Sequence, residues 1–217
     1  MYERVTKKQC SIARQRAAKI IKDVQNLLSD KYIFSFMLVG SGKWGTMIKD
    51  DKGEYDLDYQ LILTNNSPEY INNGLNSPTK IKNDFYAAFD RVSKRNEVIE
   101  NSTTAVTLIN KDHKPFHIDF VIIKEDDNYD HQIIRRNNKA HSSVNEFTWN
   151  KLPNINEAYF IFDALKPMEK QYLIEKIIIP LKQKEKAKKE NDPTKVSSCA
   201  LFIREVNNYY ADRRRNR

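Results

Sequence analysis

The fold of this chain is decided by the stretch VGSGKWGT (residues 39–46), which follows an apolar run and precedes the alternating segment EYDLDYQLIL (residues 54–63). A loop of small residues at the end of a strand typically directs backbone N–H groups at an anion, often a phosphate. Gly40 and Gly45 have the separation of the two glycines in the P-loop pattern G-x4-G-K-[S/T]. Thr46, however, stands where a P-loop needs the lysine that reaches the β and γ phosphates. The P-loop interpretation therefore fails.

Two acids, Asp56 and Asp58, lie two residues apart in the alternating segment, so their side chains share one face of a strand. Two carboxylates this close resist ionising together unless a cation shares them, and Mg²⁺ is a divalent ion that prefers such oxygen ligands. Asp119 is a third acid, at a polar-facing position of a strand expected at 115–123. Three strand-borne carboxylates can bracket two metal ions in the arrangement used for phosphoryl transfer. Ordinary surface acids on an edge strand are the alternative interpretation.

The composition indicates a folded protein, because 40 % of the 217 residues are hydrophobic and 11 % are aromatic. The formal net charge of +8 fits nucleotides or nucleic acid as partners, and it equally fits a lysine-rich soluble protein. Cys10 and Cys199 form neither a metal pattern nor a disulfide framework, which favours a reducing cytoplasm. No apolar run has the roughly 18 residues needed to span a bilayer, so no membrane association is expected.

The remaining pattern predicts an N-terminal helix, a mixed sheet and a C-terminal group of helices, hence an α+β fold. Apolar spacing and capping signals predict helices at about 6–28, from Pro78 to Val92 with Ser77 as N-cap, and at 158–165, 168–189 and 195–213. The helix at 168–189 is expected to be kinked at Pro180. Strands are expected at 33–39, 54–63, 103–109 and 115–123, with a polar loop at 64–77.

Taken together, the segments VGSGKWGT, GEYDLDYQLIL and FHIDFVI resemble the nucleotidyltransferase signature of the DNA polymerase β superfamily. The G-S-x3-G-T form of the loop is most similar to the branch containing cyclic GMP–AMP synthase, oligoadenylate synthetase and the bacterial cyclic-oligonucleotide synthases of anti-phage defence. The resemblance implies a nucleotidyltransferase fold with a mixed-sheet palm, an N-terminal spine helix and a C-terminal helical lobe, with a cleft between palm and lobe. The catalytic core is then expected over residues 1–150 and the helical lobe over residues 151–217.

The same resemblance implies the site residues. Gly40 and Ser41 would bind the β and γ phosphates of an incoming nucleoside triphosphate. Asp56, Asp58 and Asp119 would be the catalytic acids and would hold two Mg²⁺ ions, with Mn²⁺ as a possible substitute.

A second match lies in the C-terminal segment YLIEKIIIPLKQKEKAKKENDPTKVSSCALFIREV, which is similar in layout to a helix and serine segment of cyclic GMP–AMP synthase. Lys176 is the candidate for a phosphate-binding lysine, with Lys182 as the fallback. Ser197 and Ser198 correspond to the family's serine pair. Cys199 occupies the position of a base-stacking tyrosine, so the resemblance does not supply a stacking residue there.

The function implied is transfer of a nucleoside monophosphate from ATP or GTP with release of pyrophosphate, giving a cyclic or linear oligonucleotide second messenger. Asp119 would also lower the pKa of the attacking hydroxyl. RNA, a protein or a small molecule are the alternative acceptors. From another class, an inactive module of the same fold could bind nucleic acid through its basic helices, with steep salt dependence. The presence of all three acids favours the enzyme.

Overall fold

The computed structural model describes the chain except residues 1, 113–114, 126–130, 138–145, 153–155 and 216–217. The chain divides into two compact units, and each is discontinuous in sequence. The sheet unit comprises Thr6–Val39 and Asp56–Leu152, and the helical unit comprises Met1–Val5, Gly40–Tyr55 and Pro153–Arg217. The division into 1–150 and 151–217 remains a prediction.

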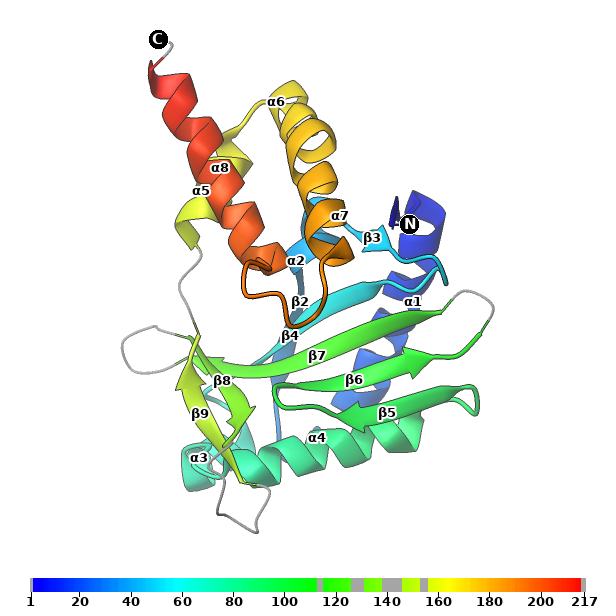
Figure 1. Cartoon of the computed structure of the whole chain (residues 1–217). Helices are drawn as coiled ribbons and strands as arrows, with labels where there is room; N and C mark the ends of the chain where they lie inside the picture. Colours follow the sequence, from blue (N-terminus) through cyan, green and yellow to red (C-terminus); the bar gives the residue numbers. More distant parts are fainter. Residues whose placement is uncertain (1, 113–114, 126–130, 138–145, 153–155, 216–217) are drawn as a thin grey trace. The chain divides into compact units, whose positions relative to one another are not determined.

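The sheet unit is built on a mixed sheet, as the sequence predicted (Figure 1). Its main path has the order β2 (Phe34–Val39), β4 (Asp56–Leu63), β7 (Phe116–Glu125), β6 (Ala105–Asn110) and β5 (Glu97–Asn101). β4 and β7 are parallel, and the other neighbours are antiparallel. At one end β7 also pairs with β8 (His131–Arg136), which pairs with β9 (Phe147–Lys151). The sequence analysis did not identify β5, β8 or β9.

The two long helices of the sheet unit begin close to the residues predicted from the sequence. α1 (Lys7–Leu27) starts after Thr6, which forms a capping box with Gln9. α4 (Pro78–Val92) starts after Ser77, with proline at its first position. α4 extends along β5 and β6 and contacts β9 (Figure 1).

One sequence prediction in this unit was wrong. Residues 64–77 were expected to form a polar loop, yet α3 (Pro68–Asn73) lies within them. The signals were present in the sequence, because Pro68 opens the helix and Gly74 closes it in the left-handed conformation at φ 59°. Ile71, the one aliphatic residue of this helix, is exposed, so a pattern based on apolar spacing did not reveal it.

Burial alternates along β4 and fixes the direction of its acids. Leu57, Tyr59 and Leu61 are buried on one face, while Asp56, Asp58 and Gln60 are exposed or half-buried on the other. The helix-side core includes a stacked pair, Phe89 of α4 and Phe120 of β7, with ring centroids 4.2 Å apart. Shifting the pairing of β4 by one residue would bury its acids and expose its apolar residues, so the core specifies the strand's register.

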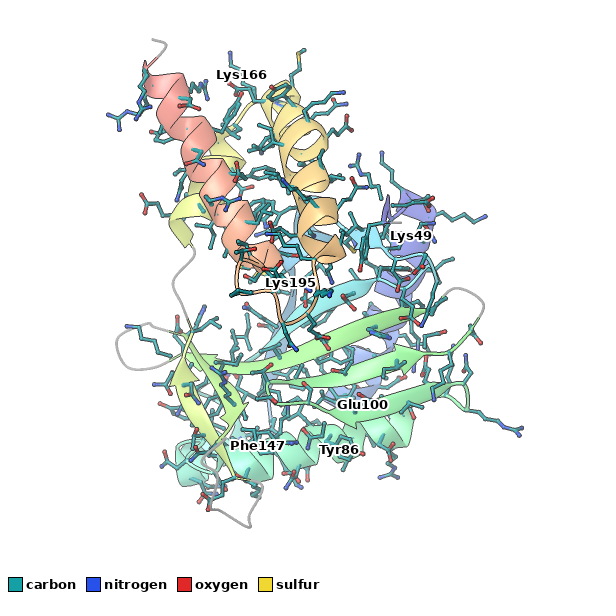
Figure 2. The ribbon with its side chains drawn as sticks, in the orientation of Figure 1. Lys49, Tyr86, Glu100, Phe147, Lys166 and Lys195 are labelled. Carbon is teal, nitrogen blue, oxygen red and sulfur yellow. The ribbon has the colours of Figure 1, made fainter. Side chains whose placement is uncertain are left out.

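The helical unit gathers segments that are far apart in the sequence. It contains α2 (Gly40–Trp44), the small pair β1 (Glu3–Arg4) and β3 (Ile48–Lys49), and the helices α5 (Asn156–Ala164), α6 (Pro167–Tyr172), α7 (Ile179–Ala187) and α8 (Ser198–Arg215). Its core consists of apolar side chains from the C-terminal helices, among them Phe162, Leu173, Leu201 and Phe202. Lys195 lies in the loop that joins α7 to α8 (Figure 2). No helix in the described part of the chain is long and apolar enough to cross a membrane.

The irregularity expected at Pro180 takes the form of a π-helical segment directly before it, at Leu173–Ile178. Proline has no N–H to donate to the preceding turn. Around it the backbone widens, and Ile179 donates to the carbonyl of Ile174, five residues back. A π-helical turn takes in an extra residue, so it changes which side chains share a face beyond it.

Lys82 of α4 gives a testable feature of the sheet unit. Its side chain is fully buried, and its Nζ has no hydrogen-bond partner among the described residues. Burial lowers the pKa of Lys82 from 10.5 to about 7; the nearby charge of Arg136 also lowers it, and that of Asp119 raises it. The unfolded chain therefore binds more protons between about pH 7 and 10.5, so stability should rise with pH across that interval.

We expect Lys82→Met to stabilise the protein at pH 7 by roughly 1–3 kcal/mol, because it removes an unpaired buried amine. The variant should also flatten the rise of stability towards alkaline pH. Urea unfolding at several pH values measures both effects, with the exposed Lys111→Met as the control. A variant that is less stable than the parent at pH 7 would contradict this account.

Candidate functional site

The three predicted acids lie on neighbouring strands of the sheet unit. β4 and β7 are paired in parallel, with Asp58 directly opposite Asp119 and Asp56 opposite His117. Neighbouring strands are about 4.8 Å apart, so this register places the two carboxyl-bearing positions side by side. All four side chains project from the face opposite the buried residues of β4 and β7. The sequence indicated only the face of each strand on which an acid lies, and the strand register brings these acids next to one another.

Hydrogen bonds and charge distinguish Asp119 from the other two acids. The Thr107 hydroxyl donates to Asp119 Oδ1 at 2.6 Å, from the register partner position on β6. Burial raises the pKa of Asp119 and the Asp56 charge raises it too, against the lowering effects of Thr107, His117 and Lys82. The result is a pKa above the ordinary aspartate value. Asp119 is therefore a stronger base than an exposed aspartate.

Asp56 lies at the more exposed end of this group. His117 Nδ1 is 3.4 Å from Asp56 Oδ1, and the two side chains are 31 % and 53 % exposed. Solvent weakens a charge interaction at such a position.

The chemistry of these residues fits a divalent ion with oxygen ligands. Burial and the neighbouring Asp56 charge both raise the pKa of Asp119, and a shared cation relieves the repulsion between such carboxylates. Among the residues that the structure describes, no group of three or more potential ligands is gathered closely enough to hold a metal ion.

The glycine stretch belongs to the helical unit, where it forms a turn of helix, α2, rather than the open loop expected from the sequence. Gly40 and Gly45 both adopt positive φ, at 58° and 69°. This left-handed conformation costs glycine little and is unfavourable for residues with a Cβ. The Thr46 N–H donates to the Ser41 carbonyl at 3.1 Å and closes the turn. The two glycines therefore allow the chain to enter and leave a tight turn.

Lys182 of α7 holds this turn. Its Nζ donates to Ser41 Oγ at 2.7 Å and to the Thr46 carbonyl at 2.8 Å, and the residue is only 4 % exposed. Lys176 lies in the π-helical segment, is exposed, and does not line the pocket described below. Of the two lysines considered from the sequence, the structure brings the fallback to Ser41.

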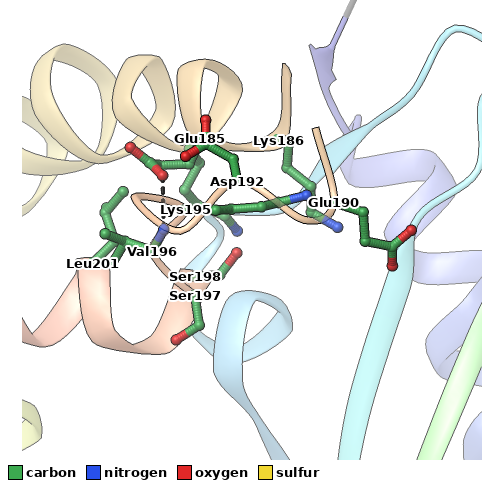
Figure 3. Close-up of a pocket in the computed structure, with 10 residues that line it drawn as sticks. Glu185, Lys186, Glu190, Asp192, Lys195, Val196, Ser197, Ser198 and Leu201 are labelled. Atoms are coloured by element: carbon green, nitrogen blue, oxygen red, sulfur yellow. Dashed lines mark hydrogen bonds between the residues drawn. The ribbon is translucent and has the colours of Figure 1, made fainter. Parts of the chain in front are cut away.

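A pocket of about 430 Å³ lies beside this lysine, between α7 and the start of α8 (Figure 3). Ser197 and Ser198 line it, as do three lysines and three acids. Glu185 accepts a hydrogen bond from the Val196 N–H at 2.8 Å and so fixes the backbone that carries the serines. The lining residues are Lys182, Glu185, Lys186, Glu190, Asp192, Lys195, Val196, Ser197, Ser198 and Leu201.

Trp44 anchors the turn to the C-terminal helices. Its ring lies 5.1 Å from Tyr159, 5.0 Å from Phe162 and 5.8 Å from Phe202, centroid to centroid. Aromatic pairs at such distances stabilise a core beyond the area that they bury. The turn that carries Ser41 is thus fixed on two sides, by this cluster and by Lys182.

Sequence reasoning missed Thr107 as a partner of Asp119. A weak signal was available, because Thr107 is a polar residue between Val106 and Leu108, which are buried. Only the register between β6 and β7 reveals which acid it meets. Cys199 is exposed next to the serine pair, and it supplies no aromatic ring where the family resemblance expected one.

The architecture matches solved structures of bacterial CD-NTases. CdnC of Escherichia coli MS115-1 with ATP aligns with a TM-score of 0.59 and 15 % identity, covering 94 % of this chain and 62 % of that one. CdnG of Bradyrhizobium diazoefficiens in complex with GTP aligns with a TM-score of 0.55 and 15 % identity, and the alignment covers 98 % of this chain and 60 % of that one. The cyclic AMP-GMP synthase DncV of Vibrio cholerae, in complex with a linear intermediate, aligns with a TM-score of 0.56 and 14 % identity. This alignment covers 83 % of this chain and 46 % of that one.

These matches confirm the nucleotidyltransferase fold that the sequence motifs implied. No protein-family model matches the sequence, and no curated protein is significantly similar to it. The chain spans between 46 % and 62 % of the length of these three structures.

Proposed function

We propose that this chain is a Mg²⁺-dependent nucleotidyltransferase that uses ATP or GTP, releases pyrophosphate and joins nucleotides into a cyclic or linear second messenger. The observation that carries the proposal is the register of β4 against β7. It places Asp119 opposite Asp58, and Asp56 lies two residues before Asp58 on the same strand. Carboxylates held this close resist ionising together unless a cation shares them. The nucleotide-bound synthases of similar fold support the same chemistry.

In this proposal the helical unit binds the triphosphate. Gly40 and Ser41 contact the β and γ phosphates, and Gly40 directly follows Val39, the register partner of Asp58. Lys182 supplies a positive charge next to the Ser41 hydroxyl. Ser197 and Ser198 add hydroxyl donors from the pocket wall.

The sheet unit supplies the acids. Asp56, Asp58 and Asp119 would hold the metal ions, and two bound Mg²⁺ ions supply charge that stabilises the attacking and leaving oxygens. Asp119 would lower the pKa of the attacking hydroxyl, by electrostatics and as a base. The Thr107 hydroxyl donates to Asp119 Oδ1 and so orients this carboxylate.

The proposal is tested by incubating the purified chain with four α-labelled nucleoside triphosphates and Mg²⁺ or Mn²⁺, with and without duplex DNA or RNA. A phosphatase-resistant product that requires the metal would establish nucleotide joining in a cyclic or internally linked form. Label transferred instead to RNA, protein or a small molecule would keep the enzyme class and change the acceptor. Salt-sensitive duplex binding with no turnover under any condition would favour the inactive nucleic-acid-binding module.

The choice between Lys182 and Lys176 gives a separate prediction. We expect Lys182→Met to weaken triphosphate binding by about tenfold or more, because it removes a charged hydrogen-bond donor at Ser41. Lys176→Met should change the affinity by less than about twofold, since its amine is solvated and exposed. Titration with a non-hydrolysable ATP analogue measures both, and thermal unfolding shows whether each variant is folded. The reverse order of effects would assign the phosphate contact to Lys176.

A further inference from the structure

The free edge of β2 is an unusual surface for a soluble domain. Within the described part of the chain β2 pairs only with β4, so its other edge ends the main path of the sheet (Figure 1). Its sequence, Phe-Ser-Phe-Met-Leu-Val, contains neither a charge nor a proline. Natural sheets generally protect their edges with such residues. β5, at the other end of the path, carries Glu97 and Glu100.

The backbone groups that face this edge can be identified from the register. Thr64 N–H donates to the Ile33 carbonyl, so Ile33 and every second residue after it point their backbone groups at β4. The N–H and C=O groups of Phe34, Phe36 and Leu38 therefore point to the opposite side. Gln25 of α1 confirms this direction, because its Nε2 donates to the Phe34 carbonyl at 2.8 Å.

Apolar side chains flank these backbone groups. Phe36 is 42 % exposed and Met37 is 40 % exposed, on opposite faces of the strand. An extended segment added at this edge would gain backbone hydrogen bonds and cover both side chains.

One stripe of α1 lies beside the same edge and is basic. Lys7, Arg14, Lys22 and Gln25 recur at helical spacing, so they share a stripe with the small residues Ser11 and Ala18. The Gln25 contact with Phe34 fixes one end of the stripe at β2. Burial raises the pKa of Tyr59, the register partner of Leu38, and the charge of Arg14, three turns before Gln25, lowers it, so Arg14 lies near Tyr59. The stripe thus reaches β2 at Gln25, and Arg14 carries its positive charge to the neighbourhood of Tyr59.

We propose that the free edge of β2 binds an extended, acidic segment of a partner polypeptide by adding a strand to the sheet. The backbone of Phe36 and Leu38 would supply hydrogen bonds, and Arg14 and Lys22 would select negative charge. A second copy of this chain is disfavoured, because edge-to-edge pairing would place two basic stripes together. Nucleic acid would use the basic stripe and would leave the strand's hydrogen-bonding groups unpaired.

The test uses the full chain and a fluorescein-labelled peptide of alternating glutamate and valine. Polarisation measures its binding against two control peptides, one with lysine in place of glutamate and one with N-methylated backbone amides. We expect the acidic peptide to bind, and each control to bind at least about tenfold more weakly. Hydrogen exchange followed by NMR should show protection of the Phe36 and Leu38 amides when the acidic peptide binds.

Matched charge reversals locate the site. Arg14→Glu combined with Lys22→Glu should weaken peptide binding about tenfold or more, because two attractions become repulsions. Lys8→Glu combined with Lys19→Glu, on a solvent-facing stripe of the same helix, should leave it within about twofold. All four residues are exposed, so both double variants should fold.

Equal effects of the two double variants, or peptide binding without protection of the Phe36 and Leu38 amides, would overturn the proposal. So would protection of those amides in the absence of peptide in a protein that sediments as a dimer, since self-pairing would then occupy the edge. Duplex DNA or RNA that displaces the peptide and binds far more tightly would reassign the stripe to nucleic acid.

Discussion

Asp58→Asn is expected to abolish nucleotide transfer while leaving the fold intact. Asparagine keeps the size of the side chain and removes the charge that the proposed metal needs opposite Asp119. Removing a single group that stabilises transition-state charge costs roughly 10²–10³-fold in turnover. Initial rates with labelled nucleoside triphosphates at saturating Mg²⁺ measure the loss.

Glu100→Gln is the matched control, because Glu100 is an exposed acid on β5 of the same sheet (Figure 2). Its turnover should stay near that of the parent chain. Thermal unfolding should be nearly unchanged for both variants, since Asp58 is half-buried and projects away from the core. Full turnover by a folded Asp58→Asn variant would remove the acids from the proposed mechanism.

The largest effect on stability is expected at the buried pair of Arg16 and Glu97, which joins α1 to β5. Arg16 Nε and Nη2 each lie 2.6 Å from a different Glu97 oxygen, and the side chains are 7 % and 0 % exposed. Arg16→Met would leave the Glu97 charge buried and unpaired. We expect the free energy of unfolding to fall by about 3–5 kcal/mol.

Two further variants make this prediction specific. Replacing both partners, as Arg16→Met with Glu97→Leu, should restore most of the stability, because no buried charge is left alone. Arg204→Met breaks an exposed pair with Glu205 and should change stability by less than about 1 kcal/mol. Urea unfolding compares the variants, and an Arg16→Met chain as stable as the parent would contradict the prediction.

The pair of Arg16 and Glu97 should also make the stability of the fold depend on pH in the acid range. Burial raises the pKa of Glu97, but hydrogen bonds from Arg16 and from the Lys94 N–H outweigh it, so the folded-state pKa lies below 4.5. The stability contributed by the pair is therefore present above pH 4.5 and is lost as the pH falls through the folded-state value.

The strands that carry the acids could be predicted because each acid alternates with residues that must be buried. Leu57 and Tyr59 determine the direction of Asp56 and Asp58 without knowledge of any other strand. β5 escaped the analysis because two of its five residues are glutamates, and Glu97 is buried in a pair with the distant Arg16. Tertiary contacts, rather than local pattern, create that strand.

The choice between the two lysines shows another limit of sequence reasoning. Lys176 and Lys182 are both plausible on a regular helix that carries a phosphate-binding face. The π-helical turn at Leu173–Ile178 adds a residue to one turn and thereby rotates the later face relative to the earlier one by roughly 100°. Proline at 180 signals a disturbance, but not its size or direction, so only the structure places Lys182 at Ser41.

The discontinuity of the helical unit has a consequence for synthesis of the chain. The turn that carries Ser41 emerges early from the ribosome, yet its aromatic anchor depends on Phe202 and its lysine on residue 182. Domains fold largely as their residues become available. The turn should therefore become ordered only after residue 202 has been translated. A product that ends before residue 182 should have no organised turn at Ser41, because it lacks both of these contacts.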